Sequence, residues 1–171
     1  MKFLTAAISR LPEFQTLSEA VDKGAYPAAV TGLSGIHKAN IIYSLCSLKG
    51  RGAFVVAADE AEAQRLCDDL GAMGMRALFY PARDFSFRDT EGVSHEYEHQ
   101  RLQVLARLLS GECDCVVACM DAALQYTLPP EELERRRLTL KAGQAISEET
   151  VMSALLSCGY VRARAATMYR L

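Results

Sequence analysis

A glycine-containing loop with a lysine near its end is the first stretch of this sequence with residues suited to chemistry. The residues Thr-Gly-Leu-Ser-Gly-Ile-His-Lys-Ala-Asn occupy positions 31–40. Phosphate-binding loops have the spacing G-x-x-x-x-G-K-[ST], in which backbone N–H groups and the lysine hold phosphate and the hydroxyl holds Mg²⁺. Aligned with that spacing, the marked positions are Gly32, His37, Lys38 and Ala39, so the loop keeps the first glycine and the lysine.

The two departures bear on binding and on catalysis. His37 brings a side chain to a position where glycine lets the backbone approach phosphate closely. Ala39 has no oxygen with which to hold magnesium. We therefore expect no ATP hydrolysis here, no cofactor and no catalytic residue. Gly32, Gly35 and Lys38, next to a helix N-terminus, retain features of an anion site. Residual anion binding and an ordinary strand-to-helix turn with a solvated lysine both remain open.

A second motif has the spacing of a zinc peptidase. His95, Glu96 and His99 fit H-E-x-x-H, in which two histidines on one helix face bind zinc and the glutamate is the general base. Catalytic zinc needs a third protein ligand, and the remaining histidine is His37. We therefore predict no metal site, and a zinc peptidase is the less favoured alternative function.

Composition places the chain among globular proteins. Of its 171 residues, 50% are hydrophobic and 23% are charged, and the net charge of -2 argues against a wholly basic nucleic-acid-binding surface. No apolar run reaches the roughly 18 residues of a membrane span, and the N-terminal apolar stretch is short for a signal peptide, so we expect a cytoplasmic protein with no membrane partner.

The six cysteines are then expected to be reduced and mostly buried. Strand alternation predicts that Cys113, Cys115 and Cys119 share one face, but no second Cys or His pair stands at zinc spacing, so we interpret them as core residues.

Helices and strands are predicted to alternate along the first three quarters of the chain, and these elements must position the loop. Apolar periodicity and turn residues predict helices near 11–24, 36–48, 59–72 and 94–111, and strands near 28–31, 53–58, 76–80 and 113–120. Strands that alternate with helices indicate an α/β fold, with a mostly parallel sheet and helices on both faces. Ligands bind such sheets beyond the carboxyl ends of the strands, where the loop would lie.

The composition of the sequence changes near residue 128, which suggests a domain boundary there. Pro129 and Pro130 are followed by a charged run over 131–137, expected to be a solvated face, and by a short exposed strand over 136–141. A helix then begins after Ser147, which is a suitable N-cap, with Glu148 and Glu149 in its first turn. We predict one domain over 1–128 and a partial, small α+β second domain over 129–171.

Four further stretches carry a family resemblance. They are FYPARDFSFRDTEGVSHEYEHQRLQVLARLLSG at 79–111, VVACMDAALQYTLPPEEL at 116–133, LKAGQ at 140–144 and LLSCGYVR at 155–162. Together with the altered loop, they resemble the N-terminal, UvrB-like region of the bacterial transcription-repair coupling factors, the Mfd family. The resemblance spans about residues 10–162.

The resemblance implies a fold and a function. The region is similar to UvrB, whose corresponding loop is intact, so the first domain is expected to be of the P-loop or RecA-like helicase type, like UvrB domain 1a, with its ATPase lost. Family members are ATP-dependent DNA translocases whose motor lies elsewhere in the chain and acts on RNA polymerase and DNA. The UvrB-like module recruits UvrA for transcription-coupled nucleotide excision repair and restrains the motor. An active P-loop NTPase or helicase fragment is the alternative.

The end of the chain departs from the family pattern. Family members continue past GYVR into a strand whose arginine forms part of the UvrA-binding surface, whereas this sequence reads ARAATMYRL at 163–171. We interpret the chain as truncated within its second, UvrB domain 2-like part. Whether UvrA binding survives in it is left open by the sequence.

Overall fold

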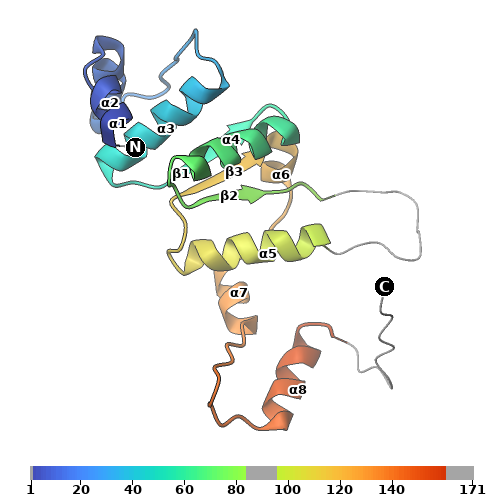
Figure 1. Cartoon of the computed structure of the whole chain (residues 1–171). Coiled ribbons are helices and arrows are strands. Elements are labelled where there is room, and N and C mark those ends of the chain that lie inside the picture. The colour runs from blue at the N-terminus through green and yellow to red at the C-terminus, as the bar shows by residue number, and fades with distance from the viewer. Residues whose placement is uncertain (1, 84–95, 161–171) are drawn as a thin grey trace, which may run out of the picture. The chain divides into compact units, whose positions relative to one another are not determined.

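The structure, a computed structural model, describes residues 2–83 and 96–160 and divides into two compact units, Met1–Tyr126 and Thr127–Leu171 (Figure 1). The assignment of these parts to a helicase-like domain and a second-domain-like module stays a prediction. Among the described residues, no helix has the length and apolar character needed to cross a membrane.

Three helices precede the sheet: α1 (Lys2–Ile8), α2 (Pro12–Lys23) and α3 (Gly35–Lys49). Gly24 ends α2 in the left-handed conformation, with φ 64°, which glycine adopts without steric cost. The strand expected at 28–31 is wrong, because these residues are exposed and belong to no strand. The physical reason is that Ala28 and Ala29 bury little apolar surface and no neighbouring strand pairs with them in the described structure.

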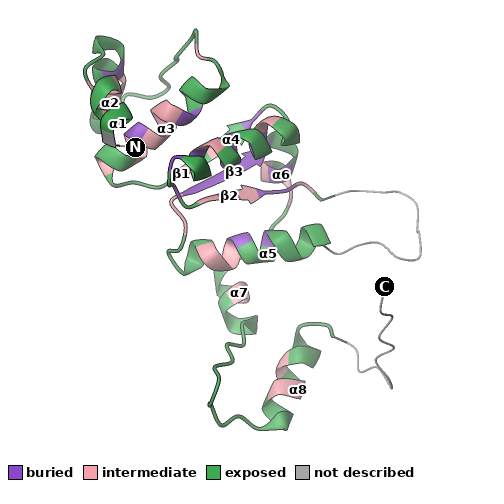
Figure 2. Ribbon diagram, in the orientation of Figure 1, coloured by how far each residue is buried: buried purple, intermediate pink, exposed green. Residues whose placement is uncertain are grey.

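The sheet consists of β1 (Ala53–Ala57), β2 (Ala77–Tyr80) and β3 (Cys115–Cys119) in the parallel order β1-β3-β2. Its register places Ala53 and Ala77 on opposite sides of Cys115. The predicted strands near 53–58, 76–80 and 113–120 are confirmed. Every residue of the central strand β3 is buried, which Figure 2 shows in purple. A run of Val and Ala suits a strand that is covered on both faces.

Helices cover both faces of this sheet, as predicted. α4 (Glu60–Ala72) packs on one face, and α5 (Glu96–Leu109) and α6 (Met120–Leu124) pack on the other (Figure 1). Two buried clusters result, one centred on Leu70 and Val117 and the other on Leu78 and Val116. The α/β class is therefore confirmed. The described sheet is small, and its three strands do not by themselves make a full RecA-like fold.

The second unit contains α7 (Pro130–Arg136) and α8 (Glu148–Ser157). α8 begins as predicted, because the Ser147 hydroxyl accepts the N–H of Thr150 at 3.2 Å. The strand expected at 136–141 is wrong: residue 136 ends α7 and residues 137–141 form no strand, since no neighbouring strand pairs with them in the described part of this unit. The charged run instead forms most of α7, where Glu132 pairs with Arg135 and Arg136.

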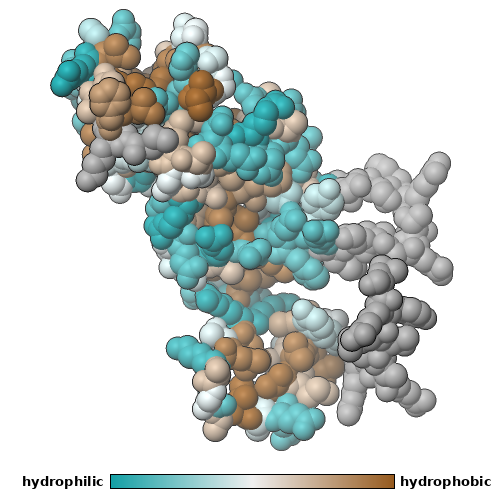
Figure 3. Space-filling model, viewed as in Figure 1, coloured by the Kyte–Doolittle hydropathy of each residue, from teal (hydrophilic) through white to brown (hydrophobic). Residues whose placement is uncertain are grey.

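No residue of either α7 or α8 is buried. Apolar side chains gather on the surface of the second unit, shown in brown in Figure 3, and the exposed ones include Leu138, Leu140, Ile146, Leu155 and Leu156. About 40 residues rarely bury a stable core alone. The described part of the second unit is therefore too small to form much of a core of its own.

Candidate functional site

The stretch predicted to be an altered phosphate loop leads into the start of α3. Gly32 has a φ of 78°, which favours glycine, and Ser34 is the N-cap of α3. The Ser34 hydroxyl makes a hydrogen bond of 3.0 Å with Nδ1 of His37 and does not bond to a backbone N–H of the first turn. The residue that departs from the glycine of a phosphate loop is therefore tied to the cap of the same helix.

Lys38 is engaged by a carboxylate of the chain itself. Its Nζ donates to Oε1 of Glu62, in the first turn of α4, at 2.7 Å. The other Glu62 oxygen, Oε2, accepts the N–H of Ala58 at 3.2 Å, and the Glu62 N–H donates to the N-cap Asp59 at 2.7 Å. The hydrogen bond from Lys38, followed by that from Ala58, lowers the pKa of Glu62, so this carboxyl is ionised at neutral pH.

Ligands of parallel sheets bind beyond the carboxyl ends of the strands, and this ion pair lies at the carboxyl end of one strand. The strand expected directly before the loop is nevertheless absent from the described structure. Ala58 directly follows Ala57, the last residue of β1. Lys38 thus reaches the carboxyl edge of the sheet through Glu62.

A cavity of about 330 Å³ adjoins the pair, and its lining residues are Gly35, Lys38, Asp59, Glu62, Arg65, Leu66 and Asp69. Its carboxylates outnumber its cations. An anion entering this cavity would meet three carboxylates, the Arg65 guanidinium and a lysine that already has a carboxylate partner. The arrangement therefore disfavours a highly charged polyphosphate.

Ala39 lies inside the core. Its exposed fraction is 0%, and it belongs to the buried cluster that includes Ala57, Ala63 and Leu66. In a working loop the residue after the lysine presents a hydroxyl to magnesium. Here that position has no oxygen and is packed among apolar side chains. The functions of Gly32, Gly35, His37, Lys38 and Ala39 as an anion site stay a prediction.

The H-E-x-x-H motif is only partly described. His95 lies outside the described residues, while Glu96 and His99 are exposed in the first turn of α5. No group of three or more His, Cys, Asp or Glu side chains suited to a metal occurs in residues 2–83 and 96–160. With His95 outside that range, the predicted absence of zinc remains a prediction.

All six cysteines are free. The expected shared face of Cys113, Cys115 and Cys119 is wrong: Cys115 packs in the cluster under α4, and the other two pack in or against the cluster under α5. The reason is that the strand spans only Cys115–Cys119, and Cys119 turns to cap α6, where its sulfur accepts the Ala122 N–H at 3.4 Å.

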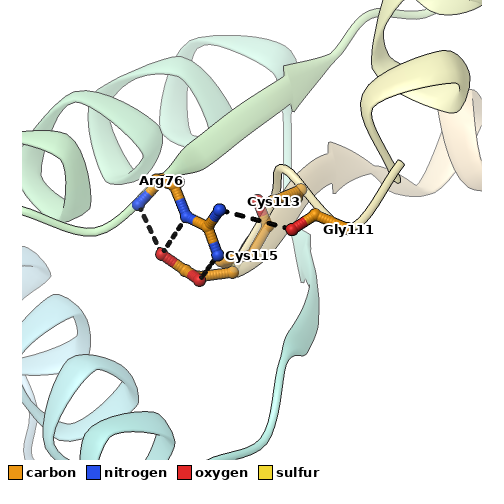
Figure 4. Close-up of polar contacts among 5 residues, drawn as sticks. Arg76, Gly111, Cys113 and Cys115 are labelled. Carbon is orange, nitrogen blue, oxygen red and sulfur yellow. Dashed lines mark hydrogen bonds and ion pairs between the residues drawn. The ribbon is translucent and has the colours of Figure 1, made fainter. Parts of the chain in front are cut away.

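Sequence reasoning missed an ion pair that joins two strands at their amino ends. Arg76, just before β2, donates through Nη2 to Oδ1 of Asp114 at 2.5 Å and through Nε to Oδ2 at 3.1 Å (Figure 4). The Arg76 N–H also donates to Asp114, and Nη1 donates to the Gly111 carbonyl. The signal in the sequence is an arginine and an aspartate that each directly precede a buried strand.

The second missed residue is Arg101 of α5. It is 3% exposed, its Nη1 donates to the carbonyls of Pro81 at 2.7 Å and Ala122 at 3.4 Å, and its guanidinium lies 4.0 Å from the Tyr80 ring centroid. Burial lowers the pKa of this guanidinium. The residue therefore ties the carboxyl ends of β2 and β3 to α5. A lone arginine in an amphipathic helix gives no local signal of that role.

Comparison with known proteins identifies relatives over almost the whole chain. The transcription-repair-coupling factor of Bacillus subtilis (strain 168) is 27% identical over 158 residues, which cover 91% of this chain and 13% of that protein. Those of Staphylococcus aureus strains MRSA252 and USA300 are each 23% identical over 164 residues, which cover 95% of this chain and 14% of theirs. The resemblance to the transcription-repair coupling factors is thereby confirmed. This chain spans about a seventh of the length of these coupling factors. No family model matches the chain.

Proposed function

We propose that the chain is a non-catalytic, UvrB-like module of a transcription-repair coupling factor, acting in the cytoplasm in transcription-coupled nucleotide excision repair. In this proposal its first domain, 1–128, is of helicase type, and 129–171 begin a UvrB domain 2-like module. The module recruits UvrA and restrains an ATP-driven motor that lies elsewhere in the full-length protein. Contact with DNA and RNA polymerase is made through that full-length protein. The similarity to coupling factors over 91% to 95% of the chain supports the process.

One observation carries the non-catalytic part of the proposal. Lys38, the residue that would meet the phosphates, donates to Glu62 at 2.7 Å. The position that should hold magnesium is Ala39, which is 0% exposed in the core. A P-loop enzyme needs both the lysine and the metal ligand. The described loop has a lysine bound to a carboxylate and no ligand at position 39.

The proposal that this chain does not hydrolyse ATP is tested by an ATPase assay of the purified chain with Mg²⁺. We expect no turnover above that of buffer, and equal traces for the chain and for Lys38→Ala. Turnover that Lys38→Ala abolishes would establish the alternative, an active P-loop NTPase. An activity unaffected by Lys38→Ala would indicate a contaminant.

The recruiting part is tested with purified UvrA. A pull-down compares this chain with a relative's segment that extends through the strand expected to carry the UvrA-binding arginine. Binding by the extended segment, lost when that arginine is changed to alanine, would support recruitment through this surface. No binding by either would contradict the recruiting part and leave the ATPase result untouched.

A further inference from the structure

The outer edge of β1 is open. β1 lies at one edge of the sheet and pairs with β3 on its other side. No strand in the described part of the chain pairs with this outer edge. Its sequence, Ala-Phe-Val-Val-Ala, contains no charge or proline, the residues that usually protect an edge from pairing with another chain. A cavity of about 430 Å³ borders the strand, lined in part by Tyr26, Lys49 and Phe54.

On the face of the sheet that carries Phe54 and Val56, the apolar layer that buries β3 does not extend over β1. Phe54 and Val56 are 61% and 43% exposed, although their partners in β3, Val116 and Ala118, are buried. Alternation places these two side chains of β1 on the same face. They form an exposed apolar pair directly beside the unpaired edge.

The backbone of the same two residues points outward. The Ala53 N–H donates to the Asp114 carbonyl at 3.0 Å, on the β3 side. Because alternate residues of a strand direct their N–H and C=O groups to opposite neighbours, those of Phe54 and Val56 face the open edge. A new strand would find donors and acceptors at these two positions.

We propose that β1 pairs antiparallel with β1 of a second copy of this chain, about a two-fold axis at Val55. Phe54 of each copy then lies opposite Val56 of the other, and each such pair exchanges both backbone hydrogen bonds. The four apolar side chains pack together on one face. The two three-stranded sheets become one continuous sheet.

The charged residues that flank β1 indicate that its pairing partner is a second copy of this chain. The segment reads Arg-Gly-Ala-Phe-Val-Val-Ala-Ala-Asp over 51–59, so pairing centred on Val55 places Arg51 of one copy opposite Asp59 of the other at both ends. Both residues are exposed, and the Asp59 backbone is extended, with φ -142° and ψ 174°. Registers centred on Phe54 or Val56 also use the outward groups. The Val56 register places alanines opposite both Arg51 and Asp59, and the Phe54 register places Ala57 opposite Arg51 and Lys49, which belongs to helix α3, opposite Asp59. The segment is therefore complementary to itself in one register.

Sedimentation velocity of the whole 171-residue chain tests this pairing. The interface is small, so concentrations from about 10 μM to about 1 mM are appropriate, and we expect the mass to rise from monomer to dimer across them. Arg51→Asp places two aspartates opposite each other at both ends and should raise the dimer Kd about tenfold or more. Arg10→Asp makes the same charge change at an exposed position remote in sequence and should leave the Kd unchanged. A monomer at every concentration, or a dimer equally affected by both changes, would overturn the proposal.

Cross-linking tests the register separately. Residues at the axis form a non-hydrogen-bonded pair with Cα atoms about 4.5 Å apart, within the range that a disulfide spans. In a Cys158→Ser background, Val55→Cys should give a disulfide-linked dimer under mild oxidation. Ala53→Cys, which lies opposite Ala57 in this register, should not. Equal cross-linking of the two variants, or none with Val55→Cys, would contradict pairing about Val55.

Discussion

Lys38 and Glu62 join the first turns of α3 and α4 through an ion pair with an Nζ–Oε1 distance of 2.7 Å. The Glu62 carboxylate accepts from Lys38 through one oxygen and from the backbone N–H of Ala58 through the other. The same contact links the loop to the carboxyl end of β1. Lys38 thus makes a structural contact in this fold.

The first prediction concerns the strength of this ion pair. A double-mutant cycle with Lys38→Met, Glu62→Gln and the double variant should give a coupling free energy of about 0.5 kcal/mol in urea unfolding, because both side chains are partly exposed. Lys38→Met should also raise the pKa of Glu62, measured by NMR titration. An unchanged pKa together with zero coupling would show that the pair does not persist in solution.

The second prediction concerns attempts to restore the phosphate loop. Ala39→Thr adds a hydroxyl and a methyl group at a fully buried position, so it should lower the free energy of unfolding by about 1–3 kcal/mol. His37→Gly combined with Ala39→Thr should still show no ATPase activity, since Lys38 stays bound to Glu62. Ala28→Thr, at an exposed position, is the matched control and should change stability by less than about 0.5 kcal/mol. Turnover by the double variant would contradict the prediction.

The sequence predicted best those features of the fold that depend on residues close together in the chain. Runs such as Ala-Phe-Val-Val-Ala predicted the three strands, and the Ser147 cap needed only Thr150, three residues away. The expected strands at 28–31 and 136–141 failed because a strand also needs a partner, which a short extended run does not specify.

The candidate site shows the same limit. The retained Lys38 and the departures from a phosphate loop at His37 and Ala39 were visible in the sequence. The partner of Lys38, however, lies 24 residues away, and that of Arg76 lies 38 residues away. Such pairs depend on which strands become neighbours. Arg101 was missed because its acceptors are backbone carbonyls, which every residue carries.

The third prediction concerns Arg101. Arg101→Ala removes two hydrogen bonds to buried carbonyls and the contact with the Tyr80 ring, so it should lower the free energy of unfolding by about 3 kcal/mol. Arg65→Ala, at an exposed position of α4, should have an effect below about 0.5 kcal/mol. Chemical denaturation of both variants provides the measurement. A loss for Arg101→Ala no larger than that for Arg65→Ala would show that the buried contacts are not important for stability.

The fourth prediction concerns acid stability and the Arg76–Asp114 pair. The hydrogen bonds from Arg76 hold the pKa of Asp114 below its usual value. A carboxyl whose pKa is lower in the folded state stabilises the fold above its unfolded pKa of about 3.9, and this stabilisation is lost as pH falls through the folded pKa. Wild type should therefore lose more stability between about pH 5 and pH 3 than Asp114→Asn does. Urea unfolding at several pH values measures the difference, and parallel pH profiles would contradict it.

The fifth prediction concerns the reactivity of the six thiols. Burial raises the pKa of Cys67 to about 11 and that of Cys115 to about 12, and it also raises those of Cys46 and Cys113. Thiolate is the reactive form, so these side chains should react slowly with a thiol-specific chromogenic disulfide reagent at pH values near 8. Cys119 is buried as well, whereas Cys158 is exposed.

We therefore expect one fast-reacting thiol in the folded chain and reaction of all six after denaturation. Cys158→Ser should remove the fast phase and leave the slow ones unchanged, because its sulfur makes only a 3.4 Å contact with the Arg136 carbonyl in the described structure. Cys46→Ser is the comparison variant and should leave the fast phase intact. A second fast thiol would mean that one of the thiols near the sheet is more accessible in solution than its burial indicates.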